Sequence, residues 1–239
     1  MPKLPRTSKA LIGLIKNNRP FQLSSQNPLS RSTTNPPITA IMRLPYAPST
    51  PPTSSDPKIT AETASIYERI AARRNPRPLI PLDLSLLHSP PVADGWNHLL
   101  GAIRTQTVLD QALLELSVCR VAVLNDAIYE WNAHAPLALK AGLSPEALRA
   151  AMDSPYGEVK VQGEKERVVL MYTDQMTRDI KVSEEVFEKL KGLLSEREIV
   201  ELTACIASYN MVSRFLVALD VGENNAKSMK SVDDLVGGK

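Results

Sequence analysis

The stretch DQALLELSVCRVAVLNDAIYEWNAHAPLALKAG, from Asp110 to Gly142, decides the fold. Before the pair Asn125-Asp126, its apolar residues cover almost every side of a helix, which predicts a helix buried in a core. Asn125 and Asp126 are residue types that often begin a helix, so they predict a break and a second helix. Pro136 cannot donate a backbone hydrogen bond and should bend that second helix. The stretch therefore predicts two packed helices.

Several side chains in this stretch can take part in chemistry: Glu115, Cys119, Tyr129, Glu130, Trp131 and His134. Glu130 and His134 are four residues apart and share one face of a helix. A histidine can take up and release protons near neutral pH. Glu115 lies on the buried helix, where a carboxyl group needs a partner or a raised pKa. These residues form a candidate proton-transfer cluster. The alternatives are a solvated Glu–His pair and a structural carboxylate.

The composition favours an all-α protein. Aromatic residues make up 5% of the 239 residues, and only 10 glycines are available for tight turns. We find no run of eighteen apolar residues without a charge, so we expect no membrane-spanning helix. The two cysteines show no CxxC or Cys/His spacing, which argues against a metal site or a disulfide and favours a reducing compartment.

Charge divides the chain into two parts. Residues 1–55 contain seven Lys or Arg and no acidic residue, whereas the remainder holds 21 basic and 26 acidic groups. A mildly acidic body is not typical of nucleic-acid binding. The basic, serine-rich first twenty residues resemble a mitochondrial transit peptide, and otherwise we expect a cytoplasmic protein. A translation start at Met42 is the alternative.

We expect three segments. Residues 1–57 hold 11 of the 19 prolines and predict a disordered basic arm. Residues 58–222 predict a helical domain, and residues 223–239 a flexible tail. Within the domain, helices are expected near residues 60–74, 83–88, 92–103, 110–124, 126–142, 164–178, 183–194 and 196–219. Capping boxes should begin the helices at Thr107 and Ser195, and Pro145 should occupy a first helical position.

The sequence around Glu115 has an internal echo. The segment from Leu109 to Asn125 is similar to the segment from Ser195 to Asn210, and Glu115-Leu-Ser-Val-Cys aligns with Glu201-Leu-Thr-Ala-Cys. This similarity predicts a duplicated helix-pair unit. Chance similarity between apolar helices is the alternative.

The arrangement Glu115…Tyr129-Glu130-Trp131-x-x-His134…Gly142-Leu-Ser resembles the carboxymuconolactone decarboxylase family of the AhpD-like superfamily. The resemblance covers residues 60–222. It implies an all-α fold with an internal duplication, assembly as a homotrimer or homohexamer, and removal of CO2 from a small unsaturated lactone or oxo-acid. It implies no metal and no organic cofactor.

The resemblance also implies roles for the candidate residues. His134 would be the acid/base, Glu130 its partner, and Glu115 a relay or orienting carboxylate. Tyr129 and Trp131 would wall a substrate pocket, with core packing as the alternative. A small-molecule carboxylic acid substrate also calls for a cation, for which Arg120 and Arg104 are the candidates.

The superfamily has a hydroperoxidase branch that uses a CxxC pair just before the histidine. The matching positions here are Ala127 and Glu130, so that redox pair is absent. A proton-transfer lyase is therefore the favoured hypothesis. A thiol-dependent peroxidase and a non-catalytic oligomeric scaffold are the alternatives.

Overall fold

The protein was analysed as a computed structural model that describes residues 42–238. Within these residues every regular element is a helix, which confirms the all-α prediction. The helices are α1 (Pro57–Arg74), α2 (Pro81–Leu86), α3 (Pro90–Thr105), α4 (Gln111–Leu124), α5 (Ile128–Lys140), α6 (Pro145–Asp153), α7 (Glu164–Arg178), α8 (Glu184–Lys191), α9 (Glu196–Leu219) and α10 (Val232–Val236). The predicted transit peptide lies outside the described residues.

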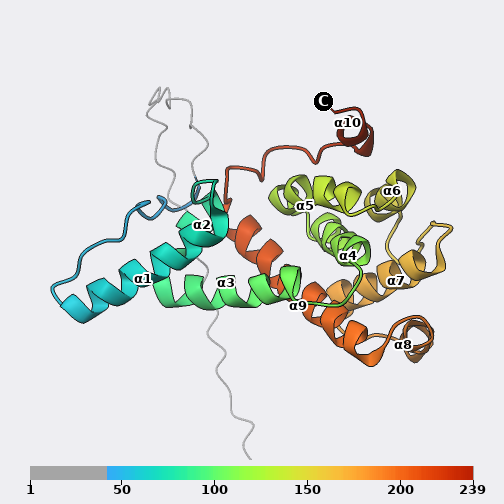
Figure 1. Cartoon of the computed structure of the whole chain (residues 1–239). Coiled ribbons are helices and arrows are strands. Elements are labelled where there is room, and N and C mark those ends of the chain that lie inside the picture. The colour runs from blue at the N-terminus through green and yellow to red at the C-terminus, as the bar shows by residue number, and fades with distance from the viewer. Residues whose placement is uncertain (1–41, 239) are drawn as a thin grey trace, which may run out of the picture. The chain divides into compact units, whose positions relative to one another are not determined.

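Helix α4 is the centre of the core. It packs against α5, α6, α7 and α9, which surround it in Figure 1. The Asp110 carboxylate accepts hydrogen bonds from the backbone N–H groups of Ala112 and Leu113 and so caps the helix. The predicted capping box at Thr107 is wrong, because the Thr107 hydroxyl donates to the carbonyl oxygen of Ile103. The apolar sequence of α4 thus gives a helix with neighbours on all sides.

The break between α4 and α5 is present where the sequence predicts it. Asp126 adopts a left-handed backbone conformation with φ 53°. The Asn125 side chain does not cap α5; it donates hydrogen bonds to Asn210 Oδ1 and Ser213 Oγ, at 3.1 and 2.8 Å. Pro136 lies inside α5, which continues to Lys140. The tight turn brings α5 back along α4 and sets the polar face of α5 beside the core.

Helix α9 is the counterpart of α4 in the internal echo. Ser195 and Glu198 form the predicted capping box. The helix then continues for 24 residues without the break that separates α4 from α5, so the echo covers one helix and not a helix pair. Among the described residues α9 alone is long and apolar enough to cross a membrane. It packs here against α3, α4, α5, α7 and α8 as a core helix.

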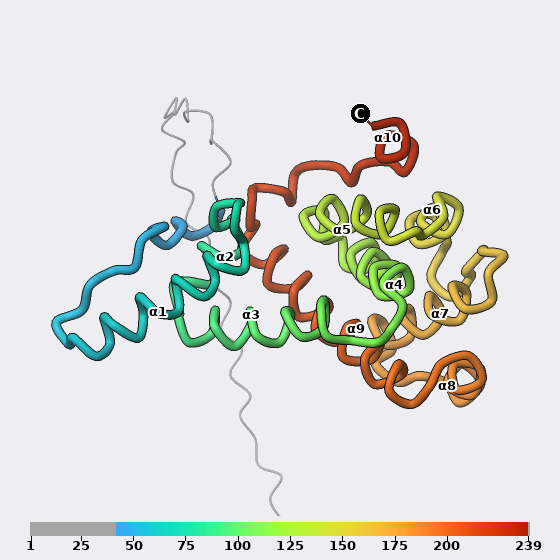
Figure 2. Tube along the Cα trace, viewed as in Figure 1, coloured from blue at the N-terminus to red at the C-terminus, as the bar shows by residue number. Residues whose placement is uncertain are grey.

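Both expected domain boundaries need correction. Residues 42–57, assigned to the arm, include the buried Met42, and the backbone N–H of Arg43 donates to the carbonyl oxygen of Leu219. Residues 223–238, assigned to a flexible tail, run past α5 to α10 at α6, as Figure 2 shows. Trp131 Nε1 donates to the carbonyl oxygen of Lys230 at 2.9 Å. Buried side chains and long-range hydrogen bonds therefore extend the helical domain at both ends.

Helices α1, α2 and α3 form a second, smaller core beside the first. Its buried residues are Ala47, Ile66, Tyr67, Ile70, Leu86, Leu87 and Ala93. Trp96 on α3 packs against Phe215 on α9, with ring centroids 5.3 Å apart, and joins the two cores. This packing places the α1–α2 connection and the end of α3 opposite α5.

Candidate functional site

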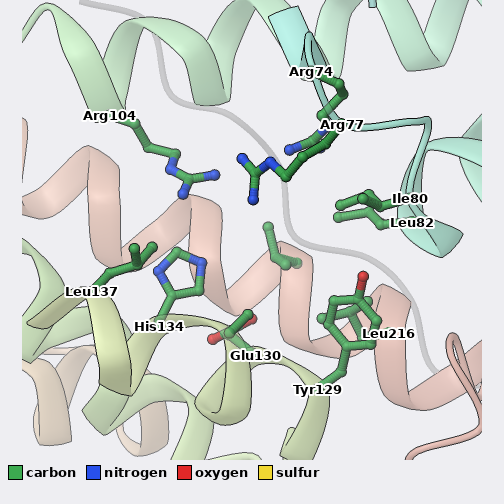
Figure 3. Close-up of a pocket in the computed structure, with 12 residues that line it drawn as sticks. Arg74, Arg77, Ile80, Leu82, Arg104, Tyr129, Glu130, His134, Leu137 and Leu216 are labelled. Atoms are coloured by element: carbon green, nitrogen blue, oxygen red, sulfur yellow. The ribbon is translucent and has the colours of Figure 1, made fainter. Parts of the chain in front are cut away.

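A cavity of about 340 Å³ lies between α5, α9, the α1–α2 connection and the end of α3. Figure 3 shows arginine side chains on one side of it and His134, Glu130 and Tyr129 on the other. The lining residues are Arg74, Arg77, Ile80, Leu82, Arg104, Tyr129, Glu130, Ala133, His134, Leu137, Val212 and Leu216. Two of the three predicted catalytic residues, Glu130 and His134, therefore line one cavity.

Glu115 holds His134 in place. His134 Nδ1 lies 2.7 Å from Glu115 Oε2, and both side chains are buried. An ionised carboxylate can only accept, so Nδ1 then carries the hydrogen and Nε2 presents a lone pair. The His134 ring also packs edge-on against Tyr209, a contact that the sequence analysis missed. The geometry orients Nε2, which has no hydrogen-bond partner within residues 42–238.

Glu130 is not the partner of His134, which corrects the predicted role. Its carboxyl oxygens are buried and have no hydrogen-bond partner among the described residues. Burial raises the pKa of Glu130 well above its ordinary value. Burial without a hydrogen-bond partner therefore favours the un-ionised acid, whose proton the side chain can donate.

We expect Glu130→Gln to raise the stability of the protein at pH 8 by about 1 kcal/mol or more, a shift of roughly 2–4 °C in Tm for a chain of this size. The folded state keeps the Glu130 proton, whereas the unfolded chain releases it above the ordinary pKa of 4.5. Unfolding then releases a proton, so the free energy of unfolding falls as the pH rises from 4.5 toward the folded-state pKa. Thermal melts of both proteins from pH 5 to pH 8 measure the difference. A gain that does not grow with pH would contradict the un-ionised state.

Tyr129 and Trp131 have different roles. Tyr129 lines the cavity, as predicted, and packs against the backbone of Gly222 so closely that a Cβ on that glycine would lie 2.8 Å from the ring. Trp131 is fully buried, does not line the cavity, and binds the carbonyl oxygen of Lys230. The alternative of ordinary core packing therefore holds for Trp131.

Arg120 cannot serve as the substrate-binding cation at this cavity. Its guanidinium is fully buried and forms a two-point ion pair with Asp174, at 2.6 and 2.9 Å. It also donates to the carbonyl oxygens of Ala151 and Ser154. All of these partners lie away from the cavity lining, so Arg120 is a structural residue that ties α4 to α7 and to the end of α6.

The cavity cations come from other elements. Arg104, the other arginine considered from sequence, lies in the last turn of α3 and lines the cavity. Arg74 and Arg77 lie at and after the end of α1 and were missed. Their sequence signal is the run of basic residues in ARRNPR, which by itself is also typical of a helix C-terminus.

The two cysteines lie outside the cavity lining. Both are free and fully buried. Burial raises the pKa of the Cys205 thiol to about 12. Burial likewise raises the pKa of Cys119 well above its ordinary value. A thiolate, the reactive form, is therefore disfavoured at both positions.

The fold and part of the sequence match known proteins. Residues 90–158 match the carboxymuconolactone decarboxylase family. A sequence comparison with curated proteins finds no match. A peroxidase-related protein from Ralstonia eutropha, described as an alkylhydroperoxidase AhpD core, has a similar structure with a TM-score of 0.57 and 17% identity over 66% of this chain and 84% of that one.

Two further solved structures share the fold. A peroxidase-related protein from Silicibacter has a TM-score of 0.55 and 16% identity over 77% of this chain and 95% of its own. The debrominase Bmp8, in complex with 2,3,4-tribromopyrrole, has a TM-score of 0.53 and 18% identity over 80% of this chain and 96% of its own. At these identities the likeness is one of fold. The segment from α3 to α6 is thus similar to the carboxymuconolactone decarboxylase family, and the helical fold is that of AhpD-like proteins.

Proposed function

We propose that the protein is a cofactor-independent lyase that removes CO2 from a small unsaturated lactone or oxo-acid by proton transfer. One observation carries the proposal: His134, oriented by Glu115, and the un-ionised Glu130 line the same cavity. Two proton-transfer groups in different protonation states are what acid–base catalysis at neutral pH requires. A cavity of about 340 Å³ is of the size that takes a small molecule.

The chemistry needs one proton for each CO2 released. When the C–CO2⁻ bond breaks, its electron pair moves into the conjugated carbonyl system and gives an enolate. Glu130 or His134 then supplies a proton to the distant carbon, and solvent restores it. Glu115 accepts the Nδ1 hydrogen of His134 and stabilises the imidazolium that forms when Nε2 takes up a proton. An un-ionised Glu130 also avoids repelling an anionic substrate.

A thiol-dependent peroxidase is the second candidate, because two structural neighbours are peroxidase-related proteins. The burial of Cys119 and Cys205 and their raised thiol pKa values speak against it. The third candidate is a non-catalytic scaffold. The homotrimeric or homohexameric assembly and the cellular location stay predictions.

The test is a turnover screen of small unsaturated lactone acids and oxo-acids that follows CO2 release. We expect release from at least one of them with the wild type and none with His134→Ala. A Cys119→Ser, Cys205→Ser double variant should release CO2 at the wild-type rate if it remains folded. Equal rates for His134→Ala and wild type would overturn the proposal. Loss of hydroperoxide reduction in the folded double variant would favour the peroxidase.

A further inference from the structure

The cavity carries positive charge that the described chain does not neutralise. Arg74 is paired with the buried Asp83 through two hydrogen bonds of 2.8 Å, so this arginine is compensated. The guanidinium groups of Arg77 and Arg104 have no hydrogen-bond or ion-pair partner within residues 42–238. Figure 3 shows the arginine side chains facing His134 and Glu130 across the cavity.

The unpaired carboxyl group in the cavity, that of Glu130, does not neutralise this positive charge. Glu130 lines the same cavity, yet neither of its oxygens has a hydrogen-bond partner, arginine or other, among the described residues. Burial raises the pKa of Glu130 well above its ordinary value, which opposes the anionic form that could neutralise an arginine. Uncompensated guanidinium groups in a cavity favour an anion from outside the chain.

We propose that Arg77 and Arg104 form a carboxylate-binding subsite that holds a second, non-reacting oxyanion of the substrate across the cavity from His134 and Glu130. The anion site itself rests on the geometry alone. That the bound anion is a non-reacting group of the substrate rests on the proposed function. Guanidinium groups match the two oxygens of a carboxylate, and two of them can bind it from different sides.

The anion-binding and proton-transfer groups of the cavity come from different elements. The subsite is formed by α3 and the α1–α2 connection, whereas the proton-transfer groups belong to α5 and α4. A substrate held at the arginines is placed with its reacting carbon toward Glu130 and His134, and holding reactants in place is itself a large part of catalysis. Arg77 and Arg104 are thus binding and positioning residues that also select for an acidic substrate.

The test uses three analogues of one shape that carry two, one or no carboxylates: the unsaturated dicarboxylate glutaconate, its monoamide and its diamide. Measuring their binding requires no turnover. Calorimetric titration of the whole protein should show that the monoamide binds about tenfold or more tightly than the diamide, the scale of a charge-assisted hydrogen bond. In Arg77→Gln and in Arg104→Gln the monoamide should weaken toward the diamide. The matched control, Arg167→Gln, replaces an exposed arginine of α7 and should bind the monoamide like wild type.

Equal binding of monoamide and diamide by wild type, or unchanged monoamide binding in both cavity variants, would overturn the inference. A circular dichroism melt of each variant excludes unfolding as the cause of lost binding. The two proposals fail separately. Anion binding without CO2 release from any lactone acid removes the lyase and leaves the subsite. CO2 release with a KM that neither cavity variant changes removes the subsite and leaves the lyase.

Discussion

Replacing Arg120 with alanine should lower the free energy of unfolding by about 3–5 kcal/mol, the scale expected when one partner of a buried ion pair is removed. Arg120 and Asp174 are both shielded from solvent, and the variant leaves the Asp174 carboxylate buried with the backbone N–H of Gly157 as its remaining partner. Three carbonyl oxygens that now accept from Arg120 also lose this donor. The effect arises from uncompensated polar groups and not from lost substrate contacts.

Urea unfolding followed by circular dichroism measures this loss, and Arg69→Ala is the control. Arg69 makes an ion pair of similar geometry with Asp94, but on the surface, where such pairs contribute about 1 kcal/mol or less. Simultaneous replacement of Arg120 by methionine and Asp174 by leucine should recover part of the loss, because no buried charge then remains. If Arg120→Ala and Arg69→Ala lower the free energy of unfolding by the same amount, the structural role of Arg120 is refuted.

Arg120 also shows why the sequence misassigned the cation. It lies between Glu115 and Tyr129 in the chain, and nearness in sequence suggested nearness in the site. Its partner Asp174 is 54 residues away, on a helix whose own pattern gives no sign of the contact. Arg77 and Arg104 precede the stretch from Asp110 to Gly142 that supplied the predicted catalytic residues, and only tertiary packing brings them to the cavity.

The fold was more predictable than the site because it depends on local rules. The apolar sequence of α4, the Asn125-Asp126 break and the capping box of α9 each give their structure within a few residues. The docked segment after residue 223 was missed because its order comes from long-range bonds, such as that from Trp131 to Lys230. A polar segment of this kind has no periodic signal of its own.

Local spacing in the sequence predicted one part of the site, the shared face of α5, and could not predict the pairing between helices. Helical spacing correctly placed Glu130 and His134 on one face of α5, and both line the cavity. The same spacing suggested that they bind each other, but the hydrogen bond of His134 goes to Glu115, nineteen residues earlier and on another helix. Spacing predicts which residues share a surface; it does not predict which of them form a pair when a second helix supplies a competing partner.

Glu115→Gln should lower kcat for CO2 release by about 100-fold or more while leaving the fold intact, because acid–base catalysis contributes roughly 10²–10⁴-fold. The amide keeps the shape of the carboxyl group but carries no negative charge to stabilise the imidazolium of His134. Its NH2 group can also donate to Nδ1, which places the ring hydrogen on Nε2 and removes the lone pair from the cavity. The rate and the thermal melt are measured on the same sample.

The internal echo supplies the matched control for this experiment. Glu201 on α9 aligns with Glu115 on α4. Glu201 accepts hydrogen bonds from the backbone N–H groups of Val108 and Leu109 and lies outside the cavity lining. Glutamine can still accept those bonds, so Glu201→Gln should change turnover by less than about twofold. Equal turnover in the two variants would show that the Glu115–His134 pair is structural. A large loss of turnover in Glu115→Gln alone, at an unchanged melting temperature, would show that Glu115 acts in catalysis and not only in the scaffold. The comparison is matched because the two glutamates occupy aligned positions in similar helices, and only Glu115 binds a histidine.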